Sequence, residues 1–478
     1  MIARLSLAVC AALCGVAGCA PSQSEILGPV QREVAARTGY DIEWRAAPAH
    51  DDEVRAAVAE LLEDELTVDR ALQIALLGNE GVQAALDELG VARGELITAT
   101  RVRNPDVEAK LRFPLSDGER SLRIDAVQDI VSLLDLGRRR GVASAELQAA
   151  SLEAAGEVVD LVANVRLAYY RAVAAERALM MRRTLSEAAD ASHSFAEALF
   201  EAGTITELEL LLERDLAEEA RLDLELAREH RLARREELSA ALGLWGAHTA
   251  WRLPPALSDI PAEDPHGGPL ERVAVERSLE LLASEQRLRA AGGDVGLARL
   301  GRWIPRLGVG VSAERHGGDD GWGLGPIVEI SVPLWDWNTG AVRRAEASLS
   351  AEQRRYAQLA VEIRSAARTA ESRLRAARAR AERYRDRLLP LRARILEETQ
   401  LAHHAMTAST FDLLRARRRQ LEGEIGYLDA KLDYWLARAA VEQIKAGRRA
   451  STRQPHRDAA RATRPGAQAS PDRQRGRN

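Results

Sequence analysis

Cysteine is nearly absent from this chain. Only three cysteines occur in 478 residues, and two of them, Cys10 and Cys14, lie within residues 1–18. That segment has the charged start and apolar core of a secretory signal, which is removed from the mature protein. The processed chain would then keep Cys19 alone, so the sequence excludes a framework of intrachain disulfides.

Long hydrophobic runs are missing as well. Beyond the signal, no stretch approaches the roughly 18 to 20 consecutive apolar residues of a membrane-spanning helix. If the chain crosses a bilayer, it must therefore do so with strands. Clusters of Pro and Gly are few, and the chain is rich in Ala, Leu, Glu and Arg, a composition that favours long helices.

A charge of one dominant sign is lacking too. The net charge is only -5 and both signs are interspersed, so nucleic acid is not a predicted partner. The sequence has no Gly-rich phosphate loop, no HExxH motif and no nucleophile elbow. Gly308 and Gly310 alternate in a strand, which indicates close packing rather than a nucleotide fingerprint. We therefore predict neither an enzyme nor a bound cofactor.

The end of the signal resembles a bacterial lipobox. Val16, Ala17 and Gly18 precede Cys19, and in a lipobox this cysteine is lipidated and becomes the first mature residue. Ala20 follows, which by the sorting rule of such lipoproteins indicates the outer membrane. The alternative is an ordinary signal peptide with a chance cysteine at its cleavage site.

The rest of the chain is organised as a duplication. After a mixed lead-in at residues 19–65, one unit covers residues 66–244 and a second covers residues 269–446. Each unit has the same order: an amphipathic helix, a proline, a short alternating stretch and a very long helix that turns back. Such a repeat indicates one supersecondary unit used twice. Residues 245–268 are predicted to be a linker, and the Arg-rich residues 447–478 a disordered tail.

The helices are longer than a compact domain can hold. The first starts at Leu66 and stops before Pro105, because the residue before proline disfavours the helical region. Long helices are predicted at about 137–200 and 207–243, and again at about 341–404 and 410–446. At 1.5 Å per residue, the first of these spans on the order of 95 Å. In the second unit an apolar stripe runs from Leu359 to Ile395, where Pro390 is expected to bend or loosen the helix.

Between the helices the hydrophobic period changes to two. The stretches at about 105–133 and 305–333 predict two β-hairpins, each with an apolar and a polar face. Each strand is near the 9 to 11 residues that cross a bilayer when tilted. Four tryptophans lie at or near the strand ends, as in an interfacial aromatic belt: Trp303, Trp322, Trp335 and Trp337. The alternative is a small sheet packed on helices.

The number of strands bears on assembly. Two hairpins give four strands, whereas the smallest membrane barrels use about eight. Lipid tolerates no open sheet edge. If the strands cross a membrane, several chains must share one barrel, and three chains would supply twelve strands.

Together these features resemble the TolC family of outer-membrane efflux proteins over about residues 66–446. The resemblance rests on the order of elements, on Pro105 and Pro305, on the turn from Gly203 to Leu208 and on two strand-to-helix junctions. The junction residues are Asp135, Gly137, Pro333, Asp336 and Asn338. The family implies a mainly α fold with a small β part: a homotrimer whose 12-stranded outer-membrane barrel is continuous with an α-helical periplasmic tunnel.

The resemblance also implies partners and a mechanism. The partners would be outer-membrane lipids, a periplasmic adaptor protein and an inner-membrane pump, of the resistance-nodulation-division type in the lipoprotein branch. The mechanism would be passive conduction of small molecules or metal ions, with a closed periplasmic end that opens by an iris-like movement of the helical tips. The tip candidates are Gly203, Thr204, Thr206, Glu207, Ser409, Thr410 and Asp412. The alternative is a lipid-anchored periplasmic coiled-coil scaffold or adaptor that never spans the membrane.

The acidic residues at the turns allow two interpretations. In a trimer, Glu207 and Asp412 would form rings of carboxylates that favour cations at the entrance. Alternatively, they are helix-start residues favoured by the helix dipole. Asp135 and Asp336 each precede a helix, which predicts N-terminal capping.

The two turns are also predicted to differ. The second has Ala408 where the first has Gly203. His403, His404 and Met406, with Glu397 and Glu398 one to two turns earlier, are of types that bind copper or zinc, since soft and imidazole ligands suit these metals. We interpret them instead as exposed residues at a helix end and predict no metal site.

Overall fold

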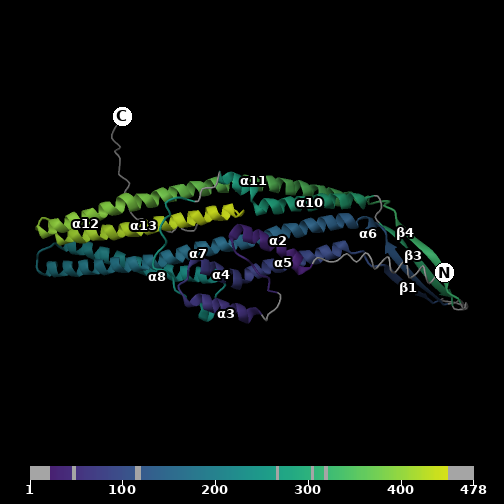
Figure 1. Cartoon of the computed structure of the whole chain (residues 1–478), viewed down its shortest axis with the longest axis horizontal. Coiled ribbons are helices and arrows are strands. Elements are labelled where there is room, and N and C mark those ends of the chain that lie inside the picture. Colours follow the sequence, from purple (N-terminus) through teal and green to yellow (C-terminus); the bar gives the residue numbers. More distant parts are fainter. Residues whose placement is uncertain are drawn as a thin grey trace, which may run out of the picture.

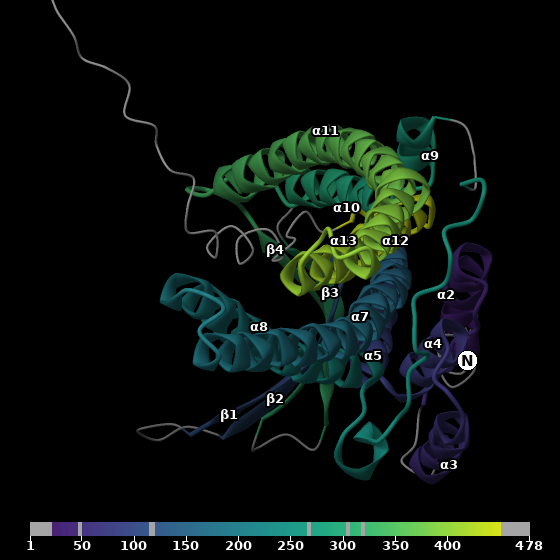
Figure 2. The same cartoon turned by 90° about the vertical axis from the view of Figure 1, so that its left-hand side faces the viewer.

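The computed structural model describes residues 22–45, 50–113, 120–264, 269–302, 306–316 and 321–450. The molecule is elongated, with strands at one end, the turns of two helical hairpins at the other and short helices around the middle (Figure 1). Viewed along the long axis, the short helices of residues 23–78 lie on one side of the long ones (Figure 2). Within the described residues, no helix is both long and apolar enough to cross a membrane.

The first unit follows two N-terminal helices, α2 (Gln23–Thr38) and α3 (His50–Glu63). Its elements are α4 (Val68–Gly78), α5 (Glu80–Thr100), β1 (Asp106–Arg112), β2 (Ser121–Asp129), the one-turn α6 (Val131–Leu134), α7 (Leu136–Glu201) and α8 (Glu207–Leu242). With 66 residues, α7 is about 100 Å long at 1.5 Å per residue.

The second unit repeats this order. After the 3₁₀ turn η1 (Gly246–Thr249), its elements are α9 (Leu270–Glu276), α10 (Leu279–Leu300), β3 (Arg306–His316), β4 (Gly323–Ser331), α11 (Thr339–Arg383), the π turn η2 (Tyr384–Leu388), α12 (Leu389–His404) and α13 (Thr410–Lys445). Both returning helices, α8 and α13, have 36 residues. The outgoing run from α11 to α12 also matches α7 in length, so the duplication extends to the length of each hairpin.

The single helix predicted from Leu66 to Pro105 is wrong, because the structure divides it at Asn79. The Asn79 backbone is extended, with φ -80° and ψ 115°, and it both ends α4 and begins α5. Its side chain accepts a hydrogen bond from Gly81 N at 2.8 Å and donates to Ala241 O at 3.2 Å. The capping preference of asparagine therefore breaks a helix that its apolar spacing alone would continue.

The strands form one antiparallel sheet in the order β1-β2-β3-β4. The two hairpins meet through β2 and β3, where Gly310 faces Val127 and Gly308 faces Asp129. A Cβ added at Gly308 would lie 2.5 Å from Val127 Cγ1, and one at Gly310 would lie 2.8 Å from Val127 Cα. The prediction that these glycines are close-packing positions is confirmed.

The two faces of the sheet differ in chemistry. One face carries ion pairs between strands, including Arg306 of β3 with Asp106 of β1 at 2.7 Å across β2, and its Asp125 is only 4% exposed. The other face carries exposed apolar side chains: Val107, Leu111, Ile124, Val309, Val311, Leu324, Val328 and Ile330. An apolar surface this extended indicates contact with a membrane or a partner.

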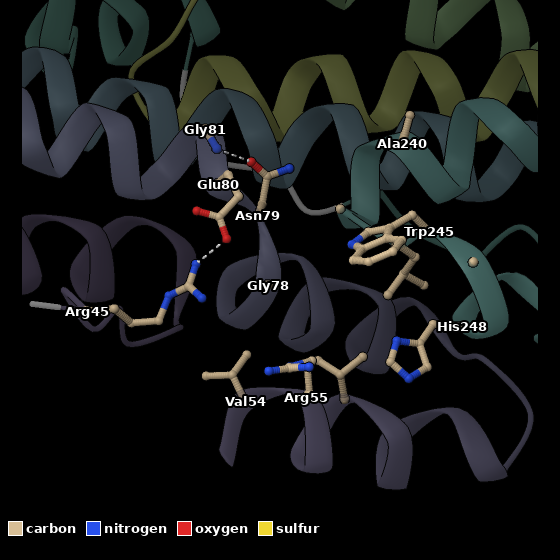
Figure 3. A pocket seen from close by; sticks show the side chains of 14 residues that line it. Arg45, Val54, Arg55, Gly78, Asn79, Glu80, Gly81, Ala240, Trp245 and His248 are labelled. Atoms are coloured by element: carbon tan, nitrogen blue, oxygen red, sulfur yellow. Dashed lines mark hydrogen bonds and ion pairs between the residues drawn. The ribbon is translucent and has the colours of Figure 1, made fainter. Parts of the chain in front are cut away.

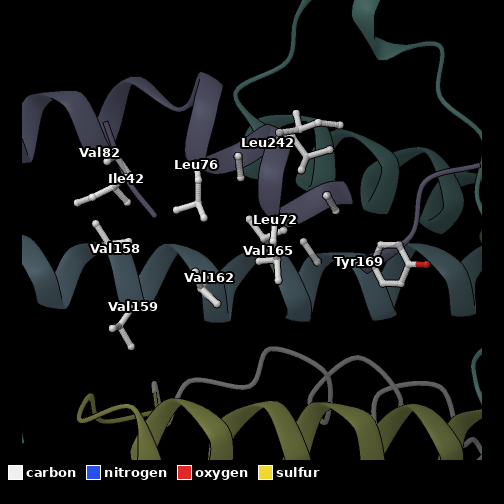
Figure 4. Close-up of a cluster of buried hydrophobic side chains, with 14 of the residues drawn as sticks. Ile42, Leu72, Leu76, Val82, Val158, Val159, Val162, Val165, Tyr169 and Leu242 are labelled. Carbon is white, nitrogen blue, oxygen red and sulfur yellow. The ribbon is translucent and has the colours of Figure 1, made fainter. Parts of the chain in front are cut away.

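The main hydrophobic core lies at the middle of the molecule. There α4 and α5 pack on α7, and Leu72, Leu76, Val158, Val162 and Val165 are buried in the contact (Figure 4). A second cluster joins α9, α11 and α13, whereas the third, toward the tips, comprises few buried residues. The middle therefore fixes the hairpins, and the tips depend less on core packing within the chain.

The segment between the two units was predicted to be a linker. In its described part, residues 245–264, it packs against the rest of the chain. Trp251, Leu257 and Ile260 are buried. Farther along, Asp259 pairs with Lys431 at 2.8 Å and Asp264 accepts from Tyr434 Oη at 2.6 Å. Apolar burial and polar contacts thus fix this segment against both units.

The predicted disorder from residue 447 onward is wrong for its first four residues. Arg448 pairs with Asp160 of α7, and Arg449 Nε lies 2.7 Å from Glu280 of α10. These ion pairs tie the end of α13 to helices of both units. The remainder of the predicted tail, residues 451–478, lies outside the described residues, as do the signal and Cys19.

The disturbance expected at Pro390 takes the form of the π turn just before it. Proline cannot donate to the carbonyl four residues earlier and its ring clashes there, and Leu389 N donates instead to Tyr384 O, five residues back. The extra residue shifts the buried stripe. Beyond the turn Leu396 is buried, whereas Leu391 and Ile395 of the predicted stripe are 55% and 44% exposed.

Candidate functional site

The helical part forms a wall with two free edges. In the described chain α7 packs on α8 and α13, and α13 packs on α11 and α12, which places α8 at one edge and α11–α12 at the other. The edge of α8 exposes six leucines: Leu208, Leu211, Leu212, Leu222, Leu226 and Leu232. The opposite edge exposes Val361, Leu391, Ile395 and Leu401. Both edges therefore present apolar side chains that the rest of the chain leaves uncovered.

The two edges also carry opposite charge. Residues 207–226 of α8 contain eight carboxylates and two arginines, whereas residues 373–394 of the other edge contain nine arginines and two carboxylates. Opposite charges on surfaces of this kind favour their association and fix its register. The edges are complementary to each other, although within one chain they lie on opposite sides of the wall.

The two tips have the same backbone design, with the second turn 203 residues after the first. Thr204 N and Oγ1 both donate to Leu199 O, and Thr407 N and Oγ1 both donate to Ala402 O. The left-handed residue just before each threonine is Gly203 (φ 71°) and Met406 (φ 58°).

The predicted equivalence of Gly203 with Ala408 is therefore wrong. Methionine rarely adopts a positive φ. The residue type of Met406 therefore gives no sign that it is the counterpart of Gly203.

Each returning helix begins with a capping box. Thr206 pairs in this way with Glu209, and Ser409 with Asp412. The backbone and side-chain bonds from Thr206 hold the pKa of Glu209 below its usual value. The side-chain and backbone bonds from Ser409 likewise lower the pKa of Asp412. Asp412 is thus a helix-start residue whose counterpart is Glu209.

Glu207 has a different place at the first tip. It is the first residue of α8, takes no part in the capping box and corresponds to Thr410 in the second tip. Both tips therefore present acidic residues at the turn, but Glu207 and Asp412 are not equivalent positions.

The tips also differ in how they meet α7. Leu208, beside the first turn, is 66% exposed. Its counterpart Phe411 instead lies against Phe195 of α7, with the ring centroids 5.8 Å apart. The second tip is consequently held against α7 by an aromatic contact, whereas Leu208 of the first tip remains at the surface.

The tryptophans that we predict to form an aromatic belt lie at both ends of β4. Trp322 precedes this strand and is 48% exposed, whereas Trp335 and Trp337 follow it and are 95% and 45% exposed. A nine-residue strand spans about 30 Å, so these side chains mark two levels separated by about that length. Trp303 lies outside the described residues.

Side-chain capping by Asp135 is a wrong prediction. Asp135 occupies the N-cap position of α7, but its side chain makes no capping bond and pairs with Arg139 at 2.6 Å. Gly137 follows within the first turn of α7, and a Cβ there would meet nothing within 4 Å. The junction is instead tied to β3, where Ile130 N donates to Leu307 O at 2.7 Å.

Capping by Asp336 is also a wrong prediction. The cap position of α11 is Asn338, whose backbone is left-handed with φ 54°. Asp336 accepts from Asn338 N at 2.9 Å, and Asn338 Nδ2 donates to Ala298 O at 3.0 Å. Pro333 lies between the end of β4 and this turn. The two junctions therefore differ in local structure: the N-cap residue of α7, Asp135, has right-handed backbone angles, whereas that of α11, Asn338, is left-handed.

A cavity of about 790 Å³ lies at the middle of the molecule, among α3, the α4–α5 junction and the end of α8 (Figure 3). Arg45 pairs with Glu80 at 2.9 Å on one side, and Trp245, which is 83% exposed, lies on another. The cavity adjoins neither the sheet nor the tips, so it is separate from the surfaces described above.

An exposed apolar sheet face at one end of paired, very long helices defines the subunit architecture of outer-membrane export channels. Comparison with known proteins agrees with this class. Residues 71–244 and residues 271–447 each match the family described as outer membrane efflux protein. The chain belongs to this family, also called the TolC family, and its two matches coincide with the two structural units.

Individual relatives and structures support the same assignment. The chain is 24% identical to the cobalt-zinc-cadmium resistance protein CzcC of Cupriavidus metallidurans, covering 79% of this chain and 90% of that protein. It is 29% identical to outer membrane protein OprJ of Pseudomonas aeruginosa, covering 59% and 62%. Its fold is similar to crystal structures of CusC (TM-score 0.64, 17% identity, 80% and 92% covered) and of VceC from Vibrio cholerae (0.64, 15%, 79% and 96%).

Proposed function

We propose that this chain forms the outer-membrane channel of a tripartite efflux pump, as a homotrimer with a shared 12-stranded barrel and a helical periplasmic tunnel. It is a passive conduit whose direct partner is a periplasmic adaptor. The adaptor in turn connects it to an inner-membrane pump of the resistance-nodulation-division type. Family membership supports the efflux role. The trimer and the conduit rest on the surfaces of the subunit.

The observation that carries the proposal is that both the sheet and the helical wall have open edges. The strands β1 and β4 are the outer strands of a four-stranded sheet, and lipid tolerates no open sheet edge. The helical wall likewise ends in the leucine-rich, acidic edge of α8 and in the arginine-rich edge of α11–α12. Joining unlike edges head to tail closes a ring when the rotation is right, and three copies give twelve strands.

The chemistry of the sheet fits a barrel of this kind. Its apolar face would contact lipid, and its ion-paired face, with Arg306, Asp106 and the buried Asp125, would line water. Trp322 and the pair Trp335 and Trp337 would lie at the two interfaces, where tryptophan is favoured. The lipid anchor at Cys19 would add a second attachment to the outer membrane.

The gate in this proposal is formed by the helical tips. The turns at Gly203, Thr204, Thr206 and Glu207 and at Ser409, Thr410 and Asp412 lie at the end of the molecule opposite to the strands (Figure 1). In a closed ring they would surround the entrance and move outward when the adaptor engages. The exposed Leu208 and the fastened Phe411 give the two tips unequal freedom to move.

The proposed cargo is metal ions or other small molecules. The name of the relative CzcC refers to resistance to cobalt, zinc and cadmium, which supports metal ions as one class. A conduit needs little selectivity in its walls, since the inner-membrane pump selects what enters.

Disulfide crosslinking between the edges tests the trimer. Leu222 on α8 and Leu391 on α12 are exposed at similar depths behind the tips. Mild oxidation of a Leu222→Cys, Leu391→Cys double variant in intact cells should yield a covalent trimer in denaturing gels, whereas each single variant should yield none. The alternative scaffold is favoured if the double variant stays monomeric and alkaline carbonate extracts the protein from the membrane.

A further inference from the structure

Two carboxylates of the α8 edge have no counter-charge in their own chain. Glu225 and Glu229 are exposed, and within the described residues neither makes an ion pair or a side-chain hydrogen bond. Residues three, four and seven positions apart share one face of a helix, so both carboxylates lie in the stripe of Leu222 and Leu226, which are exposed as well. Two negative charges are thus set into the apolar edge.

Two arginines of the opposite edge also lack a counter-charge. Arg383 ends α11 and Arg387 lies in the π turn η2; both are exposed, and no carboxylate of the described chain pairs with either. Arg385, between them, pairs with Asp386 at 2.6 Å. Ala381 is buried in the cluster that joins α11 to α13, and a residue two positions later lies about 200° farther around the helix. Arg383 therefore lies on the side away from α13, at the free edge.

The four charges lie at matching depths. Both tip turns are at the same end of the molecule (Figure 1), so depth is counted along each helix from its tip end. Glu225 is 18 residues from the start of α8, and Arg387 is 17 residues from the end of α12, which is about 27 and 26 Å at 1.5 Å per residue. Glu229 and Arg383 are 22 and 21 residues away, about 33 and 32 Å. Each carboxylate therefore has an arginine at its own level on the opposite edge.

We propose that Glu225 pairs with Arg387, and Glu229 with Arg383, across the seam between two copies of this chain. The two helices run in opposite directions, so both pairs form in one register and a slip of one helical turn breaks both. The exposed leucines beside the carboxylates would exclude water and strengthen the pairs. The inference rests on the proposed trimer, which makes a second copy the occupant of each edge, and it adds the residues that fix the register.

Charge reversal tests the pairs in the full chain, expressed in outer membranes, through the fraction of heat-modifiable oligomer at low ionic strength. Reversing the acidic pair (Glu225→Arg with Glu229→Arg) or the basic pair (Arg383→Glu with Arg387→Glu) should lower this fraction at least tenfold, because like charges then meet across every seam. Reversing all four should restore most of the oligomer, and added salt should weaken the effect of each reversal. Glu187→Arg is the matched control and should change nothing, since Glu187 is exposed on α7, which packs on both α8 and α13 and lies at neither edge.

Disulfide trapping gives a second measurement that does not depend on charge. Glu229→Cys with Arg383→Cys should crosslink two copies on mild oxidation. Glu229→Cys with Arg373→Cys should not, because Arg373 lies nine residues deeper than Glu229, about 14 Å, whereas a disulfide needs Cα atoms within about 7 Å.

The proposal is overturned if either double reversal assembles as wild type does, if the fourfold exchange assembles no better than the doubles, or if the Arg373 pair crosslinks as well as the Arg383 pair. An oligomer that conducts and tolerates both reversals removes only this inference. A wild-type chain without heat-modifiable oligomer removes the proposed trimer itself, and this inference with it.

Discussion

Replacing Gly310 by alanine should force β2 and β3 apart, whereas the same replacement at Gly325 should leave the sheet intact. At Gly310 an added Cβ would lie 2.8 Å from Val127 Cα and still closer to Ala126 O. These are backbone atoms of the paired strand, which cannot rotate away as a side chain can. At Gly325, also in the sheet, an added Cβ would meet nothing within 4 Å.

The magnitudes follow from these contacts. Overpacking costs about 1–3 kcal/mol where side chains can adjust. At Gly310 the strands must also lose ladder hydrogen bonds of about 1 kcal/mol each, so Gly310→Ala should cost about 3 kcal/mol or more. Gly325→Ala should be neutral or stabilising by about 0.5–1 kcal/mol, because alanine loses less backbone entropy on folding.

The assay is the thermal midpoint of the folded, heat-modifiable species, together with protease resistance of the sheet in isolated outer membranes. Gly310→Ala should lower both, and Gly325→Ala should match wild type. Equal behaviour of the two variants would refute the close approach of β2 and β3 that the glycines permit.

Three further predictions concern the helical part. Met406→Gly should raise the free energy of local opening at Thr407 N by about 1 kcal/mol, because only glycine adopts this φ freely. Gly203→Met should lower it at Thr204 N by a similar amount. Hydrogen exchange should accordingly be slower at Thr407 N and faster at Thr204 N, and unchanged exchange in both variants would contradict the strain. Arg448→Ala should destabilise the protein by about 2 kcal/mol, because it removes a cationic partner from Asp160 and Glu280, whose side chains are only 29% and 15% exposed. An unaltered midpoint of thermal unfolding would show that these ion pairs contribute little. Burial alone would raise the pKa of Glu237, but ion pairs with Arg234 and Arg171 outweigh burial and lower the pKa. Glu237→Gln should therefore reduce the free energy of unfolding by about 1 kcal/mol at pH 7, and by nothing at a pH below the folded-state pKa, where the wild-type carboxyl is protonated too. A loss of stability that persists at low pH would exclude this linkage.

The sequence allowed the duplicated order of elements and the alternating strands to be predicted, because both depend on local periodicity. The spacing of Leu208, Leu211, Leu212, Leu222 and Leu226 indicates an apolar stripe. Periodicity cannot reveal whether such a stripe is covered by the same chain or by another, and the structure leaves these leucines exposed. The assembly could be inferred only from the number of strands.

Other features depend on contacts that no local pattern contains. Pro390 signals a disturbed helix, but the extra residue of the π turn and the shift from Ile395 to Leu396 follow from packing against α13. Asn79 ends one helix and begins another because its side chain reaches Ala241 O. Arg448 is ordered because Asp160 and Glu280 face it. Each of these partners lies far away in the sequence.

Single-channel recording tests the central claim most directly. Purified, heat-modifiable oligomer is added to a planar lipid bilayer, and current is measured before and after the sample is boiled. A trimeric conduit predicts discrete conductance steps from the unheated oligomer and none from the boiled monomer. A protein that is monomeric before heating, extractable by alkaline carbonate and silent in the bilayer would contradict the account.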